Sequence, residues 1–357
     1  MPCVSAAGWE RGAFAVDRLS HAGLDVPEFR RESLRELRSL LSVDAAFFAT
    51  VDPATLLFTS ALAEAPLAAA TSLFLDNEFG RDDVNKFARL ASATDVVGTL
   101  DHATHGDRTA SARYQEVLRP LGLGDELRVA LVSGGRCWGV LCLHRADAAL
   151  GFSDQEIGWL RRLAPQLGEG LRRGIALFST APNAPVVQGP GIIILGHDLT
   201  VISINPQAQQ WLSYLDNADW PTNLELPLPI YAAVAQVIGN ENEPTSAPTA
   251  TRLRRAEGGW ITVQASPLTG PAGDQIAVIL DTADAAQLSS LVLAAHGLTA
   301  AQSRVAALVV QGRSTRYIVN ELHISSNTVQ EHLKAVFDKF GIGSRRELVA
   351  ALSGRPH

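Results

Sequence analysis

The last sixty residues carry closely spaced signals for starting and ending helices, and they constrain the fold more than any other part of the chain. Thr299 followed by Gln302 forms a capping box, which starts a helix. Gly312 stands where the C-terminal cap of that helix belongs. Ser314 and Ser325 each precede a further apolar run and can cap a second and a third helix. These signals predict three or four short helices with a tight turn before the third.

The third of these helices has one apolar face and one polar face. Its apolar residues recur at helical spacing, and they are Val329, Leu333, Val336 and Phe340. The opposite face mixes amide, carboxylate and ammonium groups, on Asn327, Gln330, Glu331, Lys334 and Asp338. Such groups can read base edges in the DNA major groove. Ser344 and Glu347 form another capping box, which predicts a last helix.

Charge separates this segment from the rest of the chain. From Leu298 onward there are eight Lys or Arg residues and four Asp or Glu residues, a net charge of +4. The whole chain carries −7, which leaves −11 for the preceding residues. Periodicity alone fits an ordinary small helical bundle as well as a DNA-binding module. A basic module on an acidic chain favours the phosphate-binding reading.

The segment resembles the DNA-binding domain of LuxR-type transcription regulators. The matching positions occur in order, and they are Leu298–Thr299, Gly312, Ser325, Thr328–Val329, His332–Leu333, Lys339–Phe340–Gly341–Ile342 and Ser344–Arg345. The resemblance implies an all-α tetrahelical helix-turn-helix domain over residues 297–354, with its third helix in the major groove. Carried over by position, Gln330, Glu331 and Lys334 are the base readers. The resemblance also implies phosphate or positioning contacts from Asn327, Thr328, Ser314, Arg316 and Arg345.

The first half of the chain predicts an α+β domain over residues 20–178. Helices are expected at 27–42, 66–78, 111–121 and from Ser153 to about residue 177, with strands between them. Gly134–Gly135 joins two strand runs and signals a hairpin. The run from Trp138 to Leu143, followed by Phe152–Ser153, resembles the closing hairpin and helix of a GAF domain.

The GAF resemblance implies a pocket for a small organic effector between the sheet and the helices on one face. The candidate lining residues are apolar or aromatic, and they are Phe47, Phe58, Phe74, Phe79, Phe87, Tyr114 and Trp138. Each of them is also an ordinary core residue by type, so a packing role stays open.

The middle of the chain, residues 186–283, follows a stretch rich in proline and asparagine. Its expected order of two strands, two helices and three strands resembles a PAS-like α/β domain. The resemblance leaves open whether this domain binds a ligand or mediates dimerisation. Residues 284–296 are expected to form a linker helix before the DNA-binding module.

The motifs of common enzymes are missing from the sequence, including the P-loop, the nucleotide-binding glycine run, the nucleophile elbow and the zinc-protease motif. We therefore expect no catalytic activity and no cofactor. Asp101–His102, His105 and Asp107 have metal-ligand types, but no distant Cys or His cluster completes the set, so no metal site is expected. Cys137 and Cys142 lie five apart in a strand run, which predicts opposite faces and no redox pair.

These features favour a cytoplasmic, homodimeric, ligand-responsive transcription regulator that binds double-stranded operator DNA. No apolar run approaches the ~20 residues of a membrane span, and no secretory signal is recognised, so no membrane association is expected. The alternative is a ligand-independent regulator whose GAF-like and PAS-like domains only mediate dimerisation. A third hypothesis is an adaptor whose helical tail docks a protein.

Overall fold

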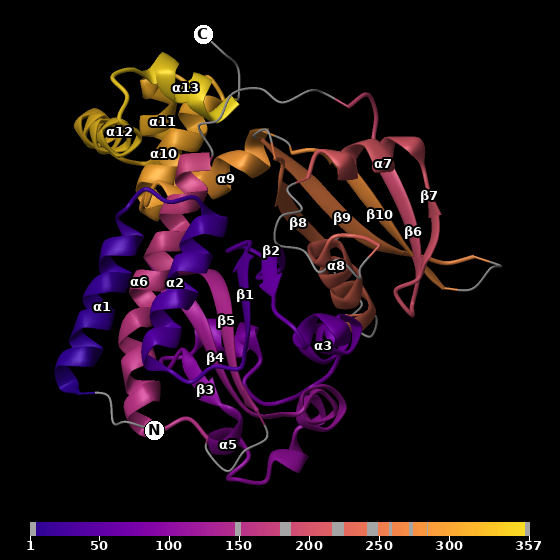
Figure 1. The fold of residues 1–357 in the computed structure, drawn as a ribbon. Coiled ribbons are helices and arrows are strands. Elements are labelled where there is room, and N and C mark those ends of the chain that lie inside the picture. The colour runs from indigo at the N-terminus through magenta and orange to yellow at the C-terminus, as the bar shows by residue number, and fades with distance from the viewer. Residues whose placement is uncertain are drawn as a thin grey trace.

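The fold consists of two five-stranded antiparallel sheets and a C-terminal group of helices (Figure 1). The computed structural model describes residues 5–146, 151–178, 187–215, 225–240, 249–256, 259–270, 274–283 and 285–353. The first sheet has the order β2-β1-β5-β4-β3 and the second β7-β6-β10-β9-β8. When the strands of each sheet are numbered from one to five along the chain, both sheets have the order 2-1-5-4-3. The two sheet domains therefore share one topology.

The first sheet is covered by helices on one face. Its strands are β1 (Ala45–Val51), β2 (Phe58–Ala63), β3 (Val97–Thr99), β4 (Leu123–Ser133) and β5 (Arg136–Ala146). The covering helices are α1 (Ala6–Ser20), α2 (Val26–Leu40) and α6 (Asp154–Phe178). Phe48, Leu127 and Leu141 face them from the sheet, and Trp9 of α1 packs against Trp159 of α6. No helix is expected from the sequence at the position of α1, although Ser5 caps it.

The opposite face of the first sheet is covered by short helical segments. They are η1 (Leu67–Ala70), α3 (Thr71–Leu75), η2 (Asp76–Gly80), α4 (Phe87–Ser92), α5 (Leu100–Ala103), η3 (Arg108–Ala110), η4 (Tyr114–Leu118) and η5 (Arg119–Leu121). The two segments predicted to be helices, 66–78 and 111–121, are helical, but neither is one regular α-helix. Each changes pitch and contains a π-helical turn, which periodicity in a sequence does not reveal.

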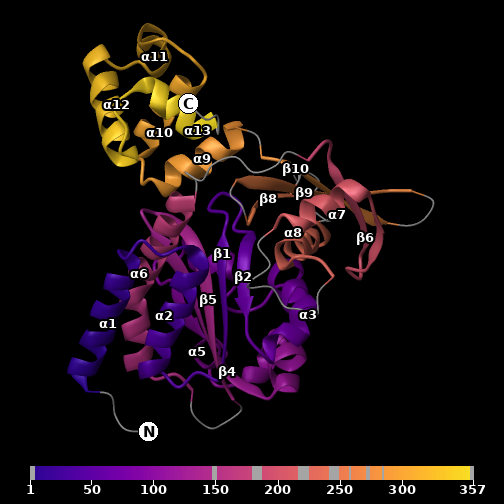
Figure 2. The same ribbon diagram turned by 45° about the horizontal axis from the view of Figure 1, so that its top comes forward.

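The second sheet is packed against the first domain through one helix. Its strands are β6 (Gly191–Gly196), β7 (Val201–Ile204), β8 (Thr249–Arg254), β9 (Trp260–Leu268) and β10 (Gln275–Thr282). Its helices are α7 (Pro206–Ser213) and α8 (Leu228–Gly239). α8 lies between the two sheets (Figures 1 and 2), and nine of its twelve residues are buried. One hydrophobic core therefore runs from Phe47 and Phe58 of the first domain through α8 to Val263 and Val278 of the second.

A buried ion pair adds to this contact. Arg252 of β8 donates two hydrogen bonds to the carboxylate of Asp52, both at 2.7 Å. Thr251 also donates to the carbonyl oxygen of Phe58 at 3.3 Å. Edge strand β8 is thus held beside β2 of the first domain, and the two sheets meet through a surface that is both apolar and charged.

The C-terminal helices are α10 (Ala300–Val310), α11 (Thr315–Leu322), α12 (Ser326–Phe340) and α13 (Arg345–Ser353). The predicted caps are confirmed, because Thr299 and Gln302 form both bonds of the capping box and Ser314 and Ser325 cap α11 and α12. His323 supplies the tight turn with a left-handed backbone, φ +52°.

The helix before this domain, α9 (Ala285–Ala295), is embedded in two cores. Leu291, Ala294 and Ala295 pack into the core beneath α6, whereas Val292 and Leu293 pack into the core of the C-terminal helices. The expected linker helix is therefore not a solvated spacer, because the GAF-like domain and the C-terminal helices each bury some of its side chains. No helix in the described part of the chain is long and apolar enough to cross a membrane.

The prediction that Cys137 and Cys142 lie on opposite faces is wrong. The register between β4 and β5 shifts where Leu131 pairs with Gly139 and Val132 with Cys137, so Trp138 is an extra residue on β5. This bulge resets the alternation of side chains. Both cysteines belong to the same core, and burial raises the pKa of the Cys137 thiol to about 11.

Breaking the ion pair between the sheet domains should destabilise the chain. We expect Asp52→Asn to lower the free energy of unfolding by about 3–5 kcal/mol, because it removes the buried carboxylate charge that accepts two hydrogen bonds from the Arg252 guanidinium. Asp95→Asn is the matched control, since it breaks a two-bond Asp–Arg pair that is about half exposed. The control should cost less than about 1 kcal/mol. Urea unfolding of both variants measures the difference, and equal losses would contradict a structural role for the buried pair.

Candidate functional site

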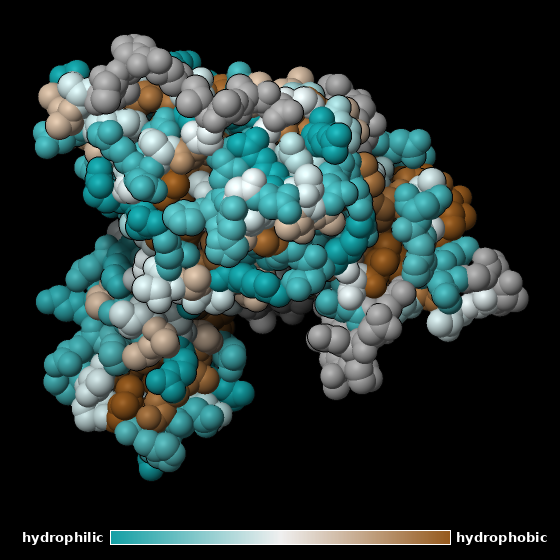
Figure 3. Space-filling view, turned by 90° about the horizontal axis from the view of Figure 1, so that it is seen from below, coloured by the Kyte–Doolittle hydropathy of each residue, from teal (hydrophilic) through white to brown (hydrophobic). Residues whose placement is uncertain are grey.

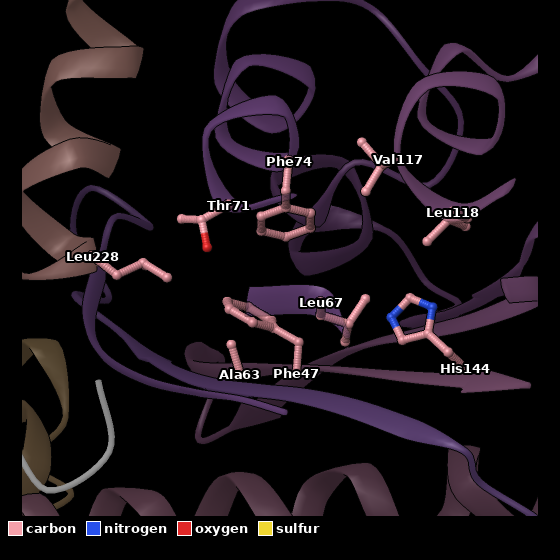
Figure 4. A pocket seen from close by; sticks show the side chains of 9 residues that line it. All are labelled: Phe47, Ala63, Leu67, Thr71, Phe74, Val117, Leu118, His144 and Leu228. Atoms are coloured by element: carbon pink, nitrogen blue, oxygen red, sulfur yellow. The ribbon is translucent and has the colours of Figure 1, made fainter. Parts of the chain in front are cut away.

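The first domain contains a cavity between its sheet and the short helices that cover it (Figure 4). Its free volume is about 20 Å³, which is room for roughly one water molecule, so a larger ligand must widen it. The lining residues come from β1, β2 and β5, from the helical roof, and from α8, and they are Phe47, Ala63, Leu67, Thr71, Phe74, Val117, Leu118, His144 and Leu228.

The floor of the cavity is one face of the sheet, and strand register divides it into two parts. Phe47 pairs with Ala63 on one side and with Cys142 on the other. His144 pairs with Glu126 across β4 and β5. Residues directly opposite each other point to the same face. The β1–β2 part of this floor is therefore apolar, and the β4–β5 part carries polar and ionised groups.

The polar part belongs to a buried network of ions. The Nε atom of Arg113 donates to Glu126 at 2.8 Å, and the Nη2 atom of Arg128 donates to Glu78 at 2.6 Å. Asp83 accepts from the backbone nitrogen of Arg113 at 2.8 Å. Burial raises the pKa of the Glu126 carboxyl, but the two arginines outweigh it and the net pKa is lowered. The network therefore keeps its charges in a dry interior.

His144 joins the cavity to this network. Its side chain is buried, and burial lowers the pKa of its imidazole to about 4, an effect that Glu126 opposes and Arg128 reinforces. The ring is therefore neutral at neutral pH. Among the described residues, neither its Nδ1 atom nor the Oε1 atom of Glu126 has a hydrogen-bond partner.

Glu126, Cys142 and His144 are donor types that metals use, and one ligand atom of each lies within 4.8 Å of the others. However, the Nε atom of Arg128 lies 3.9 Å from the Glu126 carboxylate, and burial raises the pKa of the Cys142 thiol well above its usual range. A neighbouring guanidinium and a protonated thiol both disfavour a divalent cation. At the other candidate position, Arg108 holds the Asp101 carboxylate through two hydrogen bonds.

The structure brings together some of the aromatic residues selected from the sequence. Phe47 and Phe74 line the cavity with ring centroids 5.0 Å apart. Phe58 and Phe79 extend the same aromatic group behind them, with ring centroids 5.4 Å apart.

The other three selected aromatics lie elsewhere. The guanidinium of Arg128 lies over the ring of Phe87, 3.8 Å from its centroid. Tyr114 is in a separate core beneath η4. Trp138 is on the face of the sheet that α1, α2 and α6 cover. His144, Thr71 and Leu228 also line the cavity, but they are not among the residues selected from the sequence. The alternation of Cys142 and His144 along β5 is a signal that could have identified His144.

A second candidate surface is the polar face of α12. Asn327, Gln330, Glu331 and Lys334 are exposed, whereas Val329 and Leu333 are buried against α10 and α11. The Nδ2 atom of Asn327 donates to Glu331 at 2.9 Å, which orders this face. Four polar side chains on one exposed helix face can therefore meet DNA together.

The residues predicted to contact phosphate lie on, or at the start of, α11, α12 and α13. Ser314 and Thr328 lie in the first turns or caps of α11 and α12, and the N-terminal end of a helix favours anions. Arg316 is exposed on α11, and Arg345 donates to the carbonyl oxygen of Arg313. Lys339 is different, because its Nζ atom is held by Gly297 and Gln302 at 2.7 and 2.9 Å.

An exposed polar helix after a tight turn, on a chain that also encloses a cavity, defines a helix-turn-helix DNA-binding protein with a sensor-type domain. Residues 25–171 match the family model of the GAF domain. Residues 296–352 match that of the bacterial regulatory proteins of the luxR family. The chain is therefore a LuxR-type DNA-binding regulator that carries a GAF domain. No curated protein matches the chain.

Three solved structures illustrate the more distant likenesses. The Vibrio cholerae VqmA dimer is 19% identical over 47% of this chain and 83% of its own, with a TM-score of 0.21. The VqmA–ligand–DNA complex is 21% identical over 47% and 84%, with a TM-score of 0.24. The Escherichia coli DhaR(N)–DhaL complex is 14% identical over 78% and 89%, with a TM-score of 0.24. TM-scores this low do not establish a common overall fold.

The neutral state of His144 predicts a specific loss of stability in acid. The unfolded chain protonates this residue below about pH 6.5, whereas the folded chain does so only near pH 4. Stability is therefore fully present above pH 6.5 and falls as the pH drops toward 4. Between pH 7 and 5 the wild type should lose about 2 kcal/mol more than His144→Phe. Urea unfolding across this range measures the loss, and parallel curves for the two proteins would contradict a buried neutral imidazole.

Proposed function

We propose that this chain is a homodimeric transcription regulator that reads operator DNA with Gln330, Glu331 and Lys334 and responds to a small organic effector in the GAF cavity. The observation that carries this proposal is the packing of α9, which is buried at once in the core of the GAF domain and in the core of the DNA-binding helices. The sensor and the DNA-binding domain therefore contact one common element, because α9 packs on α6 and on α10 and α13. DNA binding also implies residence in the cytoplasm with the chromosome.

The contacts around α9 give a route from the sensor to the reading helix. Arg172 of α6 donates to the carbonyl oxygen of Ala295 at the end of α9. The next residue, His296, stacks on Phe340 of α12 with ring centroids 3.8 Å apart. The Nζ atom of Lys339 donates to the carbonyl oxygen of Gly297. A displacement of α6 relative to α9 would therefore reorient α12.

The cavity is connected to the same route from the other side. Leu228, which lines it, belongs to α8 and hence to the core that the two sheet domains share. In the middle domain, Arg252 binds Asp52 and also contacts the Ser290 hydroxyl of α9 at 3.4 Å. An effector that separates Leu228 from Phe47 would change the placement of α8 and, through β8, of α9.

The middle domain, for which we propose a PAS-like role over residues 186–283, offers a surface for the second copy. Its sheet exposes Ile192, Ile202 and Ile279, and Ile192 pairs with Ile279 across neighbouring strands. Figure 3 shows hydrophobic surface at this end of the molecule, on the right. A second copy that covers this face would pair two reading helices, as helix-turn-helix dimers require for two half-sites.

The same face supports the second candidate function, a ligand-independent regulator. In that case the GAF domain and the middle domain would only build the dimer, and occupancy of the cavity would leave DNA affinity unchanged. The direct contact of α9 with both domains favours the ligand-responsive form.

Removing the reading groups should abolish sequence preference. We expect the double variant Gln330→Ala/Lys334→Ala to lose about 1–3 kcal/mol of discrimination for each base contact removed. Operator sequences selected from random DNA by the full chain provide the probe, and binding to them is compared with binding to scrambled DNA by fluorescence anisotropy. Arg304→Ala is the control, since it removes one positive charge from α10 and leaves α12 intact. Retained discrimination in the double variant would show that α12 is not the reader.

Placing charge on the exposed sheet face should separate the dimer. We expect Ile192→Lys/Ile279→Lys to sediment as a monomer, because a second copy would have to bury two unpaired ammonium groups. Phe14→Lys is the matched control, since Phe14 is 70% exposed on α1, far along the chain from this sheet. Sedimentation velocity distinguishes the states. A double variant that remains dimeric would place the dimer contact elsewhere.

A further inference from the structure

We infer that the GAF cavity selects a neutral, largely apolar aromatic molecule that carries one hydroxyl or N–H donor, and that His144 accepts that donor. The inference rests on the proposed effector site and specifies its ligand chemistry. It follows from the arrangement of the polar atoms around the cavity.

The lining of the cavity is apolar except at two positions. Thr71 is one, and its hydroxyl already donates to the carbonyl oxygen of Ala68 at 2.8 Å. His144 is the other, and in Figure 4 one of its ring nitrogens points toward the middle of the cavity. The walls opposite are the rings of Phe47 and Phe74 and the side chain of Leu67. A ligand that widens the cavity by moving these side chains apart gains apolar contact everywhere except beside this imidazole.

The neighbouring carboxylate decides which ring nitrogen carries the proton. Glu126 stands directly across from His144, and its Oε1 atom has no hydrogen-bond partner among the described residues. An ionised carboxylate only accepts hydrogen bonds, and a neutral imidazole has one N–H group and one lone pair. The carboxylate therefore favours the tautomer whose N–H lies on its own side. The nitrogen directed into the cavity is then an acceptor, and it fits a ligand donor.

Charge in the surrounding network excludes ionised ligands. The cations are the buried Arg113 and Arg128 and the partly buried Lys86, and the anions are Glu78, Asp83 and Glu126, so that the network is already neutral. A carboxylate or an ammonium ligand would add a charge without a partner in a dry interior, and the cost of that is several kcal/mol. A phenol-like or indole-like molecule adds none.

A matched pair of probes tests the inference. Phenol and toluene have nearly the same size, and they differ in one hydroxyl group. Without an acceptor in the cavity, the more apolar toluene should bind more tightly, because the hydroxyl would be buried without a partner. We expect calorimetry on the full wild-type chain to show the opposite order. In His144→Phe the order should reverse, and the ratio of the two affinities should change at least tenfold, about 1.4 kcal/mol.

His102→Phe is the control, because it makes the same replacement at an exposed position of the GAF domain and should leave the ratio unchanged. If both probes bind and toluene is preferred by the wild type, or if His144→Phe keeps the wild-type ratio, the ligand class is wrong and the effector site stands. If neither probe binds, both the ligand class and the proposed effector site are wrong.

Nitrogen NMR of the wild-type chain serves if His144→Phe fails to fold. Burial lowers the pKa of His144 to about 4 and also lowers that of His296, so at pH 5 the His144 signal is assigned as the neutral ring that remains in His296→Ala. Phenol should shift the resonance of its unprotonated nitrogen, and toluene should not. An equal response to both compounds would overturn the role of His144 as acceptor.

Discussion

Two apolar helices, α8 and α9, hold the first domain, the middle domain and the DNA-binding domain together, because exposing their apolar side chains to water is unfavourable. Nine residues of α8 are buried between the sheets, and α9 contributes side chains to two cores. Burying an aliphatic side chain contributes about 1.5–3 kcal/mol relative to leaving it exposed. Separating the domains would expose several such side chains at once, so the contacts between domains have the character of a protein interior.

The charged contacts depend on this apolar burial. Arg252 and Asp52 would contribute little as an exposed pair. Between two packed sheets, however, each strongly needs its partner, because an unpaired buried charge costs several kcal/mol. The same reasoning applies to Arg113, Glu126 and Arg128 beneath the cavity. Apolar packing holds the domains together, and the ion pairs favour the arrangement in which these buried arginines and carboxylates meet.

The C-terminal domain could be predicted almost completely from the sequence because its determinants are local. A Ser or Thr cap acts on an N–H group only two or three residues away, and Thr299, Ser314 and Ser325 all act as the sequence predicts. The mixed α+β class and the hairpin after Ser133 were predictable for the same reason, since two adjacent glycines adopt the positive φ that the turn requires.

The cavity was predictable only in part. Phe47 and Phe74 could be selected by residue type, but Leu228 reaches the cavity only because the middle domain folds onto the first. His144 and Glu126 meet through strand register, which depends on pairing between two segments and on the bulge at Trp138. The burial of α9 by two domains was also beyond a local pattern, because a short apolar helix looks the same whether it is buried by one domain or by two.

Packing of this kind also limits how an effector can act. A ligand shifts an equilibrium only by the difference between its affinities for the two states, so the cavity must change shape between them. Leu228 is the lining residue that belongs to the middle domain, and movement of α8 is therefore the shape change that also alters the domain contact. α9 is bonded to Arg252 at Ser290 and to Arg172 at Ala295. It therefore responds to the middle domain and to α6 together. A closed cavity and an opened one would place α12 differently, although no effector atom comes near the DNA-reading face.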